Sequence, residues 1–198
     1  MRKTMPSSYR PADSLLVEDG LELRIPIEGD AEELFSKIDE NRQYLREWLP
    51  WLDDVTTIEE ESAAIRQGAY TENGCMYLIL LGGSIVGTVG LNSIDWGNRR
   101  FTVGYWLSED VTGGGIVTKC CTRLIDHCFD DLKLHRSTIL VAVENTVSRG
   151  VPERLGMTLE GIAKDREWLY DHFVDAAIYG ITAPDWEALR NQLGHGPR

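Results

Sequence analysis

The sequence predicts a single domain built on a mixed α/β sheet, with about seven mostly antiparallel strands and about four helices. Segments with the two-residue alternation of half-buried strands come in runs, and segments with helical periodicity lie between them. Glycine-containing turns join neighbouring strands into hairpins toward both ends of the chain. A chain of 198 residues without internal repeats or low-complexity tracts has the size of one domain with one sizeable core.

We expect the domain to span residues 15–183. Residues 1–14 are polar and show no periodicity, so they are expected to form a disordered lead-in. Residues 184–198 are expected to form a tail with a single helical turn, followed by a disordered GHGPR end.

The first strand is expected at residues 21–27, where apolar and polar residues alternate, and Pro26 near its end suggests an edge position. Asp30 and Glu33 have the spacing of a capping box, which predicts the start of a helix. Its buried stripe would consist of Leu34, Ile38 and Leu45.

An aromatic run at 48–52 (WLPWL) ends this helix. Because tryptophan is usually mostly buried, the run indicates core, but a wall of the substrate site or an interface between subunits would have the same composition.

Thr57 and Glu60 form a second capping box, which predicts another helix. Apolar strands follow at 76–81 and 85–91, joined by Gly82-Gly83, a turn that needs positive φ.

The central strand is expected at 101–107, and an acidic turn and three glycines lead from it into a helix. This order forms an anion cradle, because glycines allow close backbone approach and the first N–H groups of the helix are free. Phosphate or pyrophosphate is the natural ligand. A tight turn into a buried helix is the alternative, since the Walker A and G-x-G-x-x-G patterns are absent.

A β-branched, apolar run at 137–143 predicts a strand covered on both faces. A short helix with Gly156 at its C-terminal end should follow. Strands at 157–168 and 173–181 would then form the last hairpin.

The balance of 20 basic and 32 acidic residues gives a net charge of −12. This charge argues against a nucleic-acid binder and suits a cationic substrate, although an acid excess also serves solubility alone. The apolar runs are too short to span a bilayer and the start lacks the apolar core of a signal peptide. We therefore expect a cytoplasmic protein without membrane contact.

The four cysteines, Cys75, Cys120, Cys121 and Cys128, show neither C-x-x-C pairs nor a histidine pattern. They are interpreted as small core residues of a reducing compartment, and no metal site is expected.

Several segments together resemble the GNAT superfamily of N-acetyltransferases, most closely the RimJ/RimL-type group that acetylates the N-termini of ribosomal proteins. The resemblance covers about residues 21–181 and is carried by GYWLSED, GGGIVTK, VxxENxxS, ERLGM-x-LEG and EWLYDHFVD. It implies a GNAT fold with a central splayed pair of parallel strands and acetyl-CoA as the cosubstrate.

The resemblance also implies coenzyme-binding positions. The strand before the turn would bind the pantetheine arm through its backbone, the turn would bind the pyrophosphate, and an asparagine would contact the arm or order the loop beside it. By position, the residues for the pantetheine arm are Trp106, Leu107 and Ser108, and the asparagine is Asn145. The residues for the pyrophosphate are Thr112, Gly113, Gly114, Gly115, Ile116, Val117 and Thr118. Arg149 and Arg154 either assist the phosphates or lie on a solvated helix face.

The glycine turn departs from the family pattern at three positions. Thr112 stands where the family has Gln or Arg, Val117 fills a position for a small residue, and Gly114 stands where close relatives usually carry lysine. Backbone amides do most of the binding in such a cradle, so we expect coenzyme binding to survive with one favourable charge missing.

The chemistry needs a base for the amine and an acid for the leaving thiolate. Pro152 occupies the place of the tyrosine acid common in the superfamily. The RimL-like group uses a serine acid and a glutamate base, which match Ser148 and Glu167. Ser148 is equally interpreted as the N-cap of a helix that starts there, and Glu167 as a surface partner of Arg166.

Two further features bear on the base. Trp168 could supply an apolar wall beside Glu167. His172 and His135 are the alternative bases.

The sequence thus predicts an acetyl-CoA-dependent N-acetyltransferase in which a bound amine attacks directly within a ternary complex. The favoured acceptor is the N-terminal α-amine of a ribosomal protein. A small amine (a polyamine, an amino acid or an antibiotic) is the first alternative, and a non-catalytic acyl-CoA-binding module is the second. An open cleft between the first helices and the last hairpin would favour a peptide, and a closed pocket a metabolite. Assembly into a homo-oligomer is also considered.

Overall fold

The computed structural model describes residues 12–192. Most of the lead-in and the end of the tail, both expected to be disordered, lie outside the described residues. No helix between residues 12 and 192 is long and apolar enough to cross a membrane.

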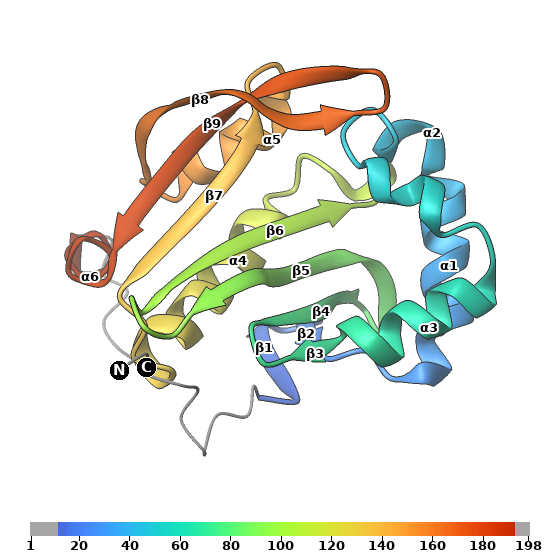
Figure 1. The fold of residues 1–198 in the computed structure, drawn as a ribbon. Coiled ribbons are helices and arrows are strands. Elements are labelled where there is room, and N and C mark those ends of the chain that lie inside the picture. The colour runs from blue at the N-terminus through green and yellow to red at the C-terminus, as the bar shows by residue number, and fades with distance from the viewer. Residues whose placement is uncertain (1–11, 193–198) are drawn as a thin grey trace.

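Nine strands form one sheet within the described residues, in the order β1-β2-β4-β5-β6-β7-β9-β8 with β3 paired to β4 (Figure 1). Every neighbouring pair is antiparallel except β6 and β7, which are parallel. The strands are β1 (Ser14–Glu18), β2 (Leu21–Arg24), β3 (Tyr70–Thr71), β4 (Gly74–Leu81), β5 (Ser84–Asp95), β6 (Arg100–Leu107), β7 (Arg136–Ala142), β8 (Thr158–Leu169) and β9 (His172–Thr182).

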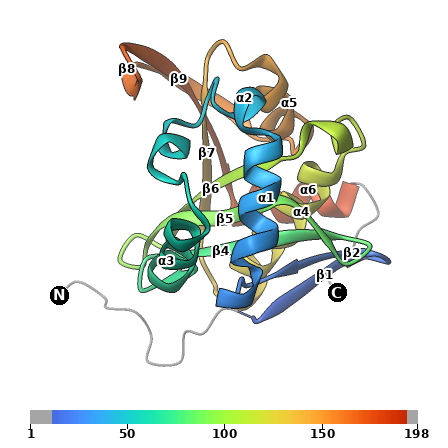
Figure 2. The same cartoon turned by 90° about the vertical axis from the view of Figure 1, so that its right-hand side faces the viewer.

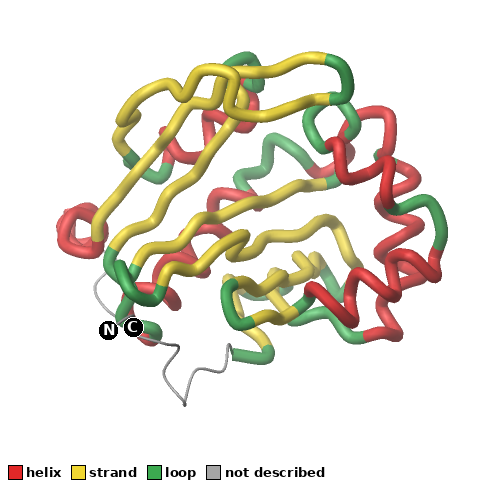
Figure 3. Tube along the Cα trace, in the orientation of Figure 1, coloured by secondary structure: helices red, strands yellow, loops and turns green. Residues whose placement is uncertain are grey.

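Six α-helices accompany the sheet in the part of the chain that the structure describes, and the first three gather at one end of it (Figure 3). They are α1 (Ala31–Glu40), α2 (Arg42–Leu45), α3 (Ile58–Gly68), α4 (Ile116–Asp126), α5 (Thr146–Arg154) and α6 (Ala183–Gln192). Figure 2 looks onto α1, with α3 beside it.

Two apolar clusters lie on the two faces of the sheet. The larger cluster packs α4, α5 and α6 against the strands, and the smaller one packs α1, α2 and α3 against β4, β5 and β6. The four cysteines are free and buried, and burial raises the pKa of the Cys75 and Cys120 thiols to about 12. Their interpretation as small core residues is confirmed.

Several predicted elements are confirmed. The Thr57–Glu60 capping box begins α3, and Gly82 and Gly83 turn the β4–β5 hairpin with φ of +59° and +88°. The central strand, the strand after α4 and the last hairpin also lie where the pattern placed them. The GNAT-type mixed sheet is therefore confirmed, with extra short elements raising the number of strands and helices.

The edge position predicted for the first strand is wrong. An additional strand, β1, pairs with β2 and takes the edge, so β2 lies inside the sheet between β1 and β4. Pro26 lies beyond the end of β2 and removes no sheet hydrogen bond.

The capping box predicted at Asp30 and Glu33 is also wrong. The Asp30 carboxylate accepts the Ile27 N–H at 2.7 Å and binds the Arg24 guanidinium, which closes a turn before α1 instead of capping it. Glu33 reaches across to the sheet and accepts the N–H of Ile85 at 2.8 Å. The predicted stripe of Leu34, Ile38 and Leu45 is buried.

The aromatic run at 48–52 does not form core as a unit. Leu52 is fully buried, whereas Trp51 is 36 % exposed and Trp48 is half-buried. The chain forms a 3-10 turn at Pro50–Asp54, which buries Leu52 and leaves Trp51 at the surface.

The C-terminal tail was expected to hold one helical turn, but α6 is ten residues long and packs its buried Trp186 into the larger cluster. Trp186 donates its indole N–H to Asp126 at 2.8 Å, and Arg190 binds Asp126 and Asp130.

Candidate functional site

The parallel strands β6 and β7 pair only at their beginnings. The register runs from Arg100 opposite Arg136 to Val103 opposite Ile139, and beyond that pair the strands diverge (Figure 1). Among the described strands, β5 is the only partner of β6 from Gly104 onward. Its edge toward β7 therefore presents free backbone groups, which an extended ligand can use as it would use a sheet edge.

Trp106, Leu107 and Ser108 lie at the end of this open edge and are buried. The Ser108 N–H donates to the Val86 carbonyl at 2.8 Å, and its carbonyl accepts from Val111 at 3.3 Å. The carbonyl keeps a second lone pair, and the residues of β6 before Ser108 supply further backbone groups for an extended ligand.

The glycine turn leads directly into α4. Gly113 and Gly115 adopt φ of +81° and +74°, and Gly115 caps α4 without a side-chain hydrogen bond. The Lys119 N–H donates to the Gly115 carbonyl, and this is the first hydrogen bond of the helix. The N–H groups of Ile116, Val117 and Thr118 are thus without helical partners, as at any helix start.

This turn fits an anion. A Cβ built on Gly113 or Gly115 would meet no atom within 4 Å, so the turn is open to a ligand. Free amides and the positive end of the helix dipole favour a phosphate group there. Thr112 uses its hydroxyl to close the turn by donating to the Glu109 carbonyl at 2.8 Å.

Asn145 caps α5. Its side-chain oxygen accepts the N–H of Ser148 at 3.0 Å, and the helix starts at Thr146. The expected helix start at Ser148 is therefore wrong, and Pro152 lies inside the helix and not in its first turn. In the structure Asn145 caps the helix that follows β7, and its expected contribution to coenzyme binding stays a prediction.

Pro152 has a local consequence for Ser148. In a regular helix the N–H of residue 152 would donate to the carbonyl of residue 148, and proline has no N–H. The Ser148 carbonyl instead accepts the hydroxyl of Tyr105 from β6 at 3.0 Å. The Ser148 hydroxyl donates back to the Tyr105 oxygen at 3.2 Å.

Tyr105 is a site residue that sequence reasoning missed, because its place in an alternating strand indicated only core. Burial raises the pKa of its phenol well above the ordinary value. The phenol therefore stays neutral and acts as a hydrogen-bond partner, orienting Ser148 at the edge of the gap.

Arg149 and Arg154 have different roles. Arg149 donates to the hydroxyl of Tyr179 at 3.0 Å and to the carbonyl of Val143 at 3.1 Å, so it fastens α5 to β7 and β9. Arg154 instead donates from Nε to the hydroxyl of Thr118 in α4 at 3.3 Å.

Glu167 lies on β8, exposed, directly opposite Val174. Side chains alternate along a strand, so Val174 points away from the face of Tyr179, which contacts α5. Glu167 and Ser148 thus lie on opposite faces of the part of the sheet formed by β7, β9 and β8. Trp168 points the other way from Glu167 and packs on Phe173, with ring centroids 4.8 Å apart.

The two histidines considered as bases are exposed. His172 pairs with Asp171 at 2.8 Å beside the hairpin tip. His135 precedes β7 at its paired end, roughly 20 Å of strand away from the end that borders the gap.

Asn41, between α1 and α2, is a second buried polar residue that the sequence pattern did not single out. Its amide donates to the Ser108 hydroxyl at 2.7 Å and to the Lys37 carbonyl at 2.9 Å, and its oxygen accepts the Glu109 N–H at 2.9 Å. It joins the first helices to the end of β6. Only tertiary contact distinguishes it from a surface asparagine.

The tip of the β8–β9 hairpin reaches α2, as Figure 1 shows. Tyr170 donates its hydroxyl to the Arg46 carbonyl at 2.6 Å and approaches that of Leu49 at 3.3 Å, and the Arg46 guanidinium lies 4.1 Å above its ring. We call these contacts the Tyr170 clasp. The space between the first helices and the last hairpin is bridged at this point.

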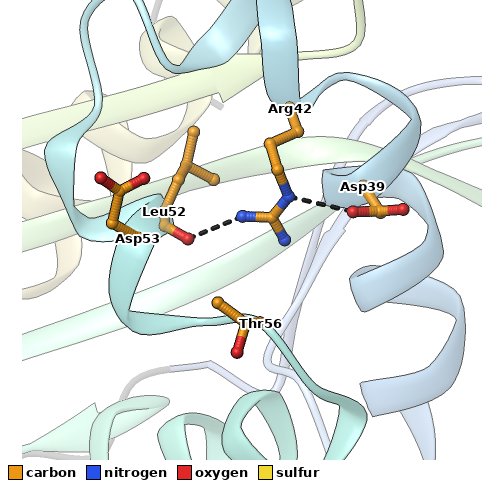
Figure 4. Close-up of a pocket in the computed structure, with 5 residues that line it drawn as sticks. All are labelled: Asp39, Arg42, Leu52, Asp53 and Thr56. Atoms are coloured by element: carbon orange, nitrogen blue, oxygen red, sulfur yellow. Dashed lines mark hydrogen bonds and ion pairs between the residues drawn. The ribbon is translucent and has the colours of Figure 1, made fainter.

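A surface hollow of about 500 Å³ lies beside the clasp, lined by Asp39, Arg42, Leu52, Asp53 and Thr56 (Figure 4). Arg42 binds Asp39 and the carbonyls of Leu52 and Val55, so its guanidinium serves to hold the 3-10 turn in place. Within residues 12–192 no group of three His, Cys, Asp or Glu side chains is arranged to hold a metal ion.

The comparisons with known proteins agree on one family. Residues 21–158 match the model of the acetyltransferase (GNAT) domain. The putative ribosomal N-acetyltransferase YdaF of Bacillus subtilis is 33 % identical over 175 residues, covering 86 % of this chain and 96 % of that protein.

Two solved structures have the same fold. RimL, the ribosomal L7/L12 alpha-N-protein acetyltransferase in complex with coenzyme A, superimposes with a TM-score of 0.82 at 28 % identity, covering 85 % of this chain and 97 % of that one. The microcin C7 self-immunity acetyltransferase MccE, in complex with acetyl-CoA and AMP, gives 0.81 at 31 % identity, covering 84 % and 94 %.

Proposed function

The chain belongs to the GNAT family of acetyltransferases, and on this premise we propose that it transfers acetyl from acetyl-CoA to the N-terminal α-amine of a protein. The observation that carries the proposal is the gap between β6 and β7, with the glycine turn at the end of β6 and Ser148 held at its edge. A ribosomal protein is the favoured acceptor, since YdaF and RimL are both named for ribosomal acetylation.

The residues around the gap suit coenzyme A. The free amides of the turn from Thr112 to Thr118 would hold the pyrophosphate, and the open edge of β6 before Ser108 would hold the pantetheine arm. Asn145 would keep the loop beside the arm in place. Acetyl-CoA supplies the activated acetyl thioester when it is bound.

Glu167 and Ser148 would handle the protons from the two faces of the sheet. The Glu167 carboxylate would take a proton from the acceptor amine, which then attacks directly while both substrates are bound. The Ser148 hydroxyl, which donates to the Tyr105 oxygen in the structure, would turn to give its proton to the leaving sulfur and would then regain a proton from solvent. The carboxylate lies on the face opposite α5, so the acceptor would enter from the side of α1 and α2.

Replacing Glu167 by Gln tests the base. We expect kcat to fall by about tenfold or more, because general-base catalysis is lost. The affinity for acetyl-CoA, measured by calorimetry, should stay unchanged. Glu187→Gln is the control, an exposed glutamate on α6 that should leave both quantities unaltered. Wild-type turnover in Glu167→Gln would refute the assignment.

The acceptor class is tested with peptides that differ only at the terminus. Peptides with a free N-terminal Ser or Ala should be acetylated, whereas the same peptides with a blocked N-terminus and an internal lysine should not. Polyamines, amino acids and amine antibiotics form the comparison set. Preference for one of these over every peptide would overturn the protein acceptor and leave the acetyltransferase activity standing.

A further inference from the structure

Asn92 on β5 places its side-chain carboxamide against Gly104 in the middle of β6. A Cβ built on Gly104 would lie 2.3 Å from Nδ2 of Asn92 and 2.6 Å from its Oδ1, so glycine at this position leaves the room that the amide occupies. The Asn92 side chain is exposed and forms no hydrogen bond with any residue between 12 and 192. Its nitrogen, a donor, and its oxygen, an acceptor, are therefore both free for a ligand.

A β-bulge directs this side chain. The register between β5 and β6 shifts between Leu91 and Ser93, so Asn92 is the extra residue of the bulge. Bulges re-aim side chains and are frequent beside active sites. Asparagine and glycine are both poor strand formers, and glycine inside a strand often marks a point where a ligand or another group comes close. Strand formation alone therefore explains neither Asn92 nor Gly104.

The carboxamide lies on the face of the sheet from which the acceptor would enter. Trp106, two residues after Gly104, packs in the smaller cluster with α1, α2 and α3. Side chains alternate along a strand, so Gly104 and the amide against it belong to this same face. Glu167, the proposed base, also lies on the face opposite α5.

The carboxamide is also level with the proposed reacting centre. Gly104 is the first residue of β6 beyond its pairing with β7. The next residue, Tyr105, points to the other face, where it contacts Ser148. Asn92 and Ser148 thus border two consecutive residues of β6 from opposite faces. An amine that approaches the thioester from the face opposite Ser148 would pass the Asn92 amide.

A second hollow, of about 400 Å³, adjoins Asn92 at the closed end of the gap. It is lined by the hydroxyl residues Ser93, Thr102 and Thr138, which are cross-strand neighbours in β5, β6 and β7, and we call it the hydroxyl hollow. Its two charged lining residues, Asp95 and Arg100, are paired with each other at 3.1 Å. The hollow is therefore polar without an unpaired charge, which suits the backbone of a polypeptide.

An extended peptide fits the free carboxamide better than a simple amine does. In an extended chain the N–H and the carbonyl of one residue point to the same side, as they do in antiparallel strand pairing. The Asn92 oxygen can accept that N–H while its nitrogen donates to that carbonyl. A simple primary amine would pair with the oxygen only.

We propose that Asn92 binds the backbone of the second residue of the acceptor and so selects a polypeptide α-amine over a small amine, with the chain continuing into the hydroxyl hollow. This inference rests on the proposed function. It adds a specificity residue on β5 to the acceptor side of the site.

Two matched acceptors test this contact. One is a peptide with a free N-terminal Ser or Ala, and the other is the same chain with an ester oxygen in place of the N–H of its second residue. In the wild type, kcat/KM should be several-fold higher for the peptide, the usual size for one hydrogen bond between uncharged groups.

Variants of Asn92 assign the preference to this residue. In Asn92→Ala, kcat/KM for the peptide should fall by about tenfold and the preference for peptide over ester should vanish, because both changes remove the same contact. Asn92→Asp keeps the accepting oxygen and should retain the preference. Asn191→Ala, which truncates an exposed asparagine on α6, is the control and should behave as the wild type.

The Kd for acetyl-CoA, measured by calorimetry, should be the same in all variants, and thermal melting confirms that each is folded. Equal kcat/KM for the two acceptors in the wild type, or an undiminished preference in Asn92→Ala, would overturn the inference alone. A weakened Kd for acetyl-CoA in Asn92→Ala would also overturn it, because the residue would then support the coenzyme site. A wild-type protein that acetylates small amines and neither of the two acceptors would instead refute the proposed protein acceptor, and the inference with it.

Discussion

Pro152 illustrates how one residue type changes the chemistry open to another. By lacking an N–H it leaves the Ser148 carbonyl for Tyr105, and the phenol oxygen then becomes the acceptor for the Ser148 hydroxyl. Serine in water is a weak acid, so its usefulness depends on being held in place. In this chain Tyr105, a partly buried residue of β6, holds it.

Tyr105→Phe should therefore lower kcat several-fold while leaving the KM for acetyl-CoA nearly unchanged, because it alters the orientation of Ser148 and not the coenzyme contacts. Loss of its two hydrogen bonds should cost about 1–2 kcal/mol in the free energy of unfolding. Tyr77→Phe is the matched control: Tyr77 is buried in the same sheet and donates to the Ala12 carbonyl at 3.1 Å. It should lose stability without losing kcat. Equal loss of kcat in both variants would show that the effect is general.

Glu61 on α3 is a buried carboxylate outside the site. It is 4 % exposed, forms no hydrogen bond or ion pair with described residues, and burial raises its pKa. The folded protein therefore binds this proton more tightly than the unfolded chain does. The free energy of unfolding falls as the pH rises from the pKa of the unfolded chain through the pKa of the folded protein. Above the folded pKa the whole cost of burying the charged carboxylate applies.

Glu61→Gln should raise the free energy of unfolding at neutral pH by about 1 kcal/mol, the usual size of a single-substitution effect. The gain over wild type should shrink on acidification, as the wild-type carboxyl becomes protonated in both states. Urea unfolding at several pH values measures this. Glu59→Gln, an exposed neighbour in the same helix, should change little. Destabilisation by Glu61→Gln at neutral pH would contradict the argument.

Among the elements, the β8–β9 hairpin and the α2 segment belong to different halves of the splayed sheet. The Tyr170 clasp joins them beyond the point where β6 and β7 diverge. Arg46 is itself held by two hydrogen bonds of 2.8 Å to Asp53. The clasp thus connects the two halves at the open end of the gap, where β6 and β7 share no backbone hydrogen bonds.

Tyr170→Phe keeps the ring under Arg46 and removes the hydroxyl bonds. We expect a loss of about 1 kcal/mol in local stability, seen as faster amide hydrogen exchange at residues 166–173 and 46–52. Exchange in β4 and β5 should be unaffected. Tyr44→Phe, also on α2 and without a hydrogen bond to described residues, is the control. Unaltered exchange at the hairpin tip would mean that the clasp contributes nothing.

At the scale of the whole molecule, α6 completes the larger cluster although it follows the last strand. Trp186 is 4 % exposed and bonds to Asp126 at the end of α4. Trp186→Ala should therefore cost about 3–5 kcal/mol in the free energy of unfolding. Trp168→Ala is the matched comparison, since Trp168 is 51 % exposed and should cost much less. Similar losses in both, by chemical denaturation, would contradict the packing described for α6.

Local patterns were sufficient for the elements whose cause is local. The Thr57 cap, the Gly82-Gly83 hairpin and the alternation in the last two strands depend on residues within a few positions of each other. The order of these elements, with the motifs around the glycine turn, was enough to identify the fold and the family.

Tertiary structure decided the partners of polar side chains. Asp30 and Glu33 have capping-box spacing, but Arg24 and the Ile85 N–H compete for their carboxylates from elsewhere in the fold. The bonds of Asn41 to Ser108 and of Tyr105 to Ser148 likewise join residues far apart in the chain. A hydrogen bond of this kind depends on which surfaces meet, and periodicity in one segment carries no information about the segment that faces it.

The sequence by itself therefore determined the mixed sheet, its glycine turn and the membership of the acetyltransferase family. Only the tertiary structure decided that β1 takes the edge, that α6 belongs to the core, and that Arg154 and not Arg149 faces the turn. The physical reason is that strand and helix formation follow from the short-range period of apolar residues. Which strand takes the sheet edge, where a helix packs and where a long charged side chain points depend on contacts between elements that are far apart in the sequence.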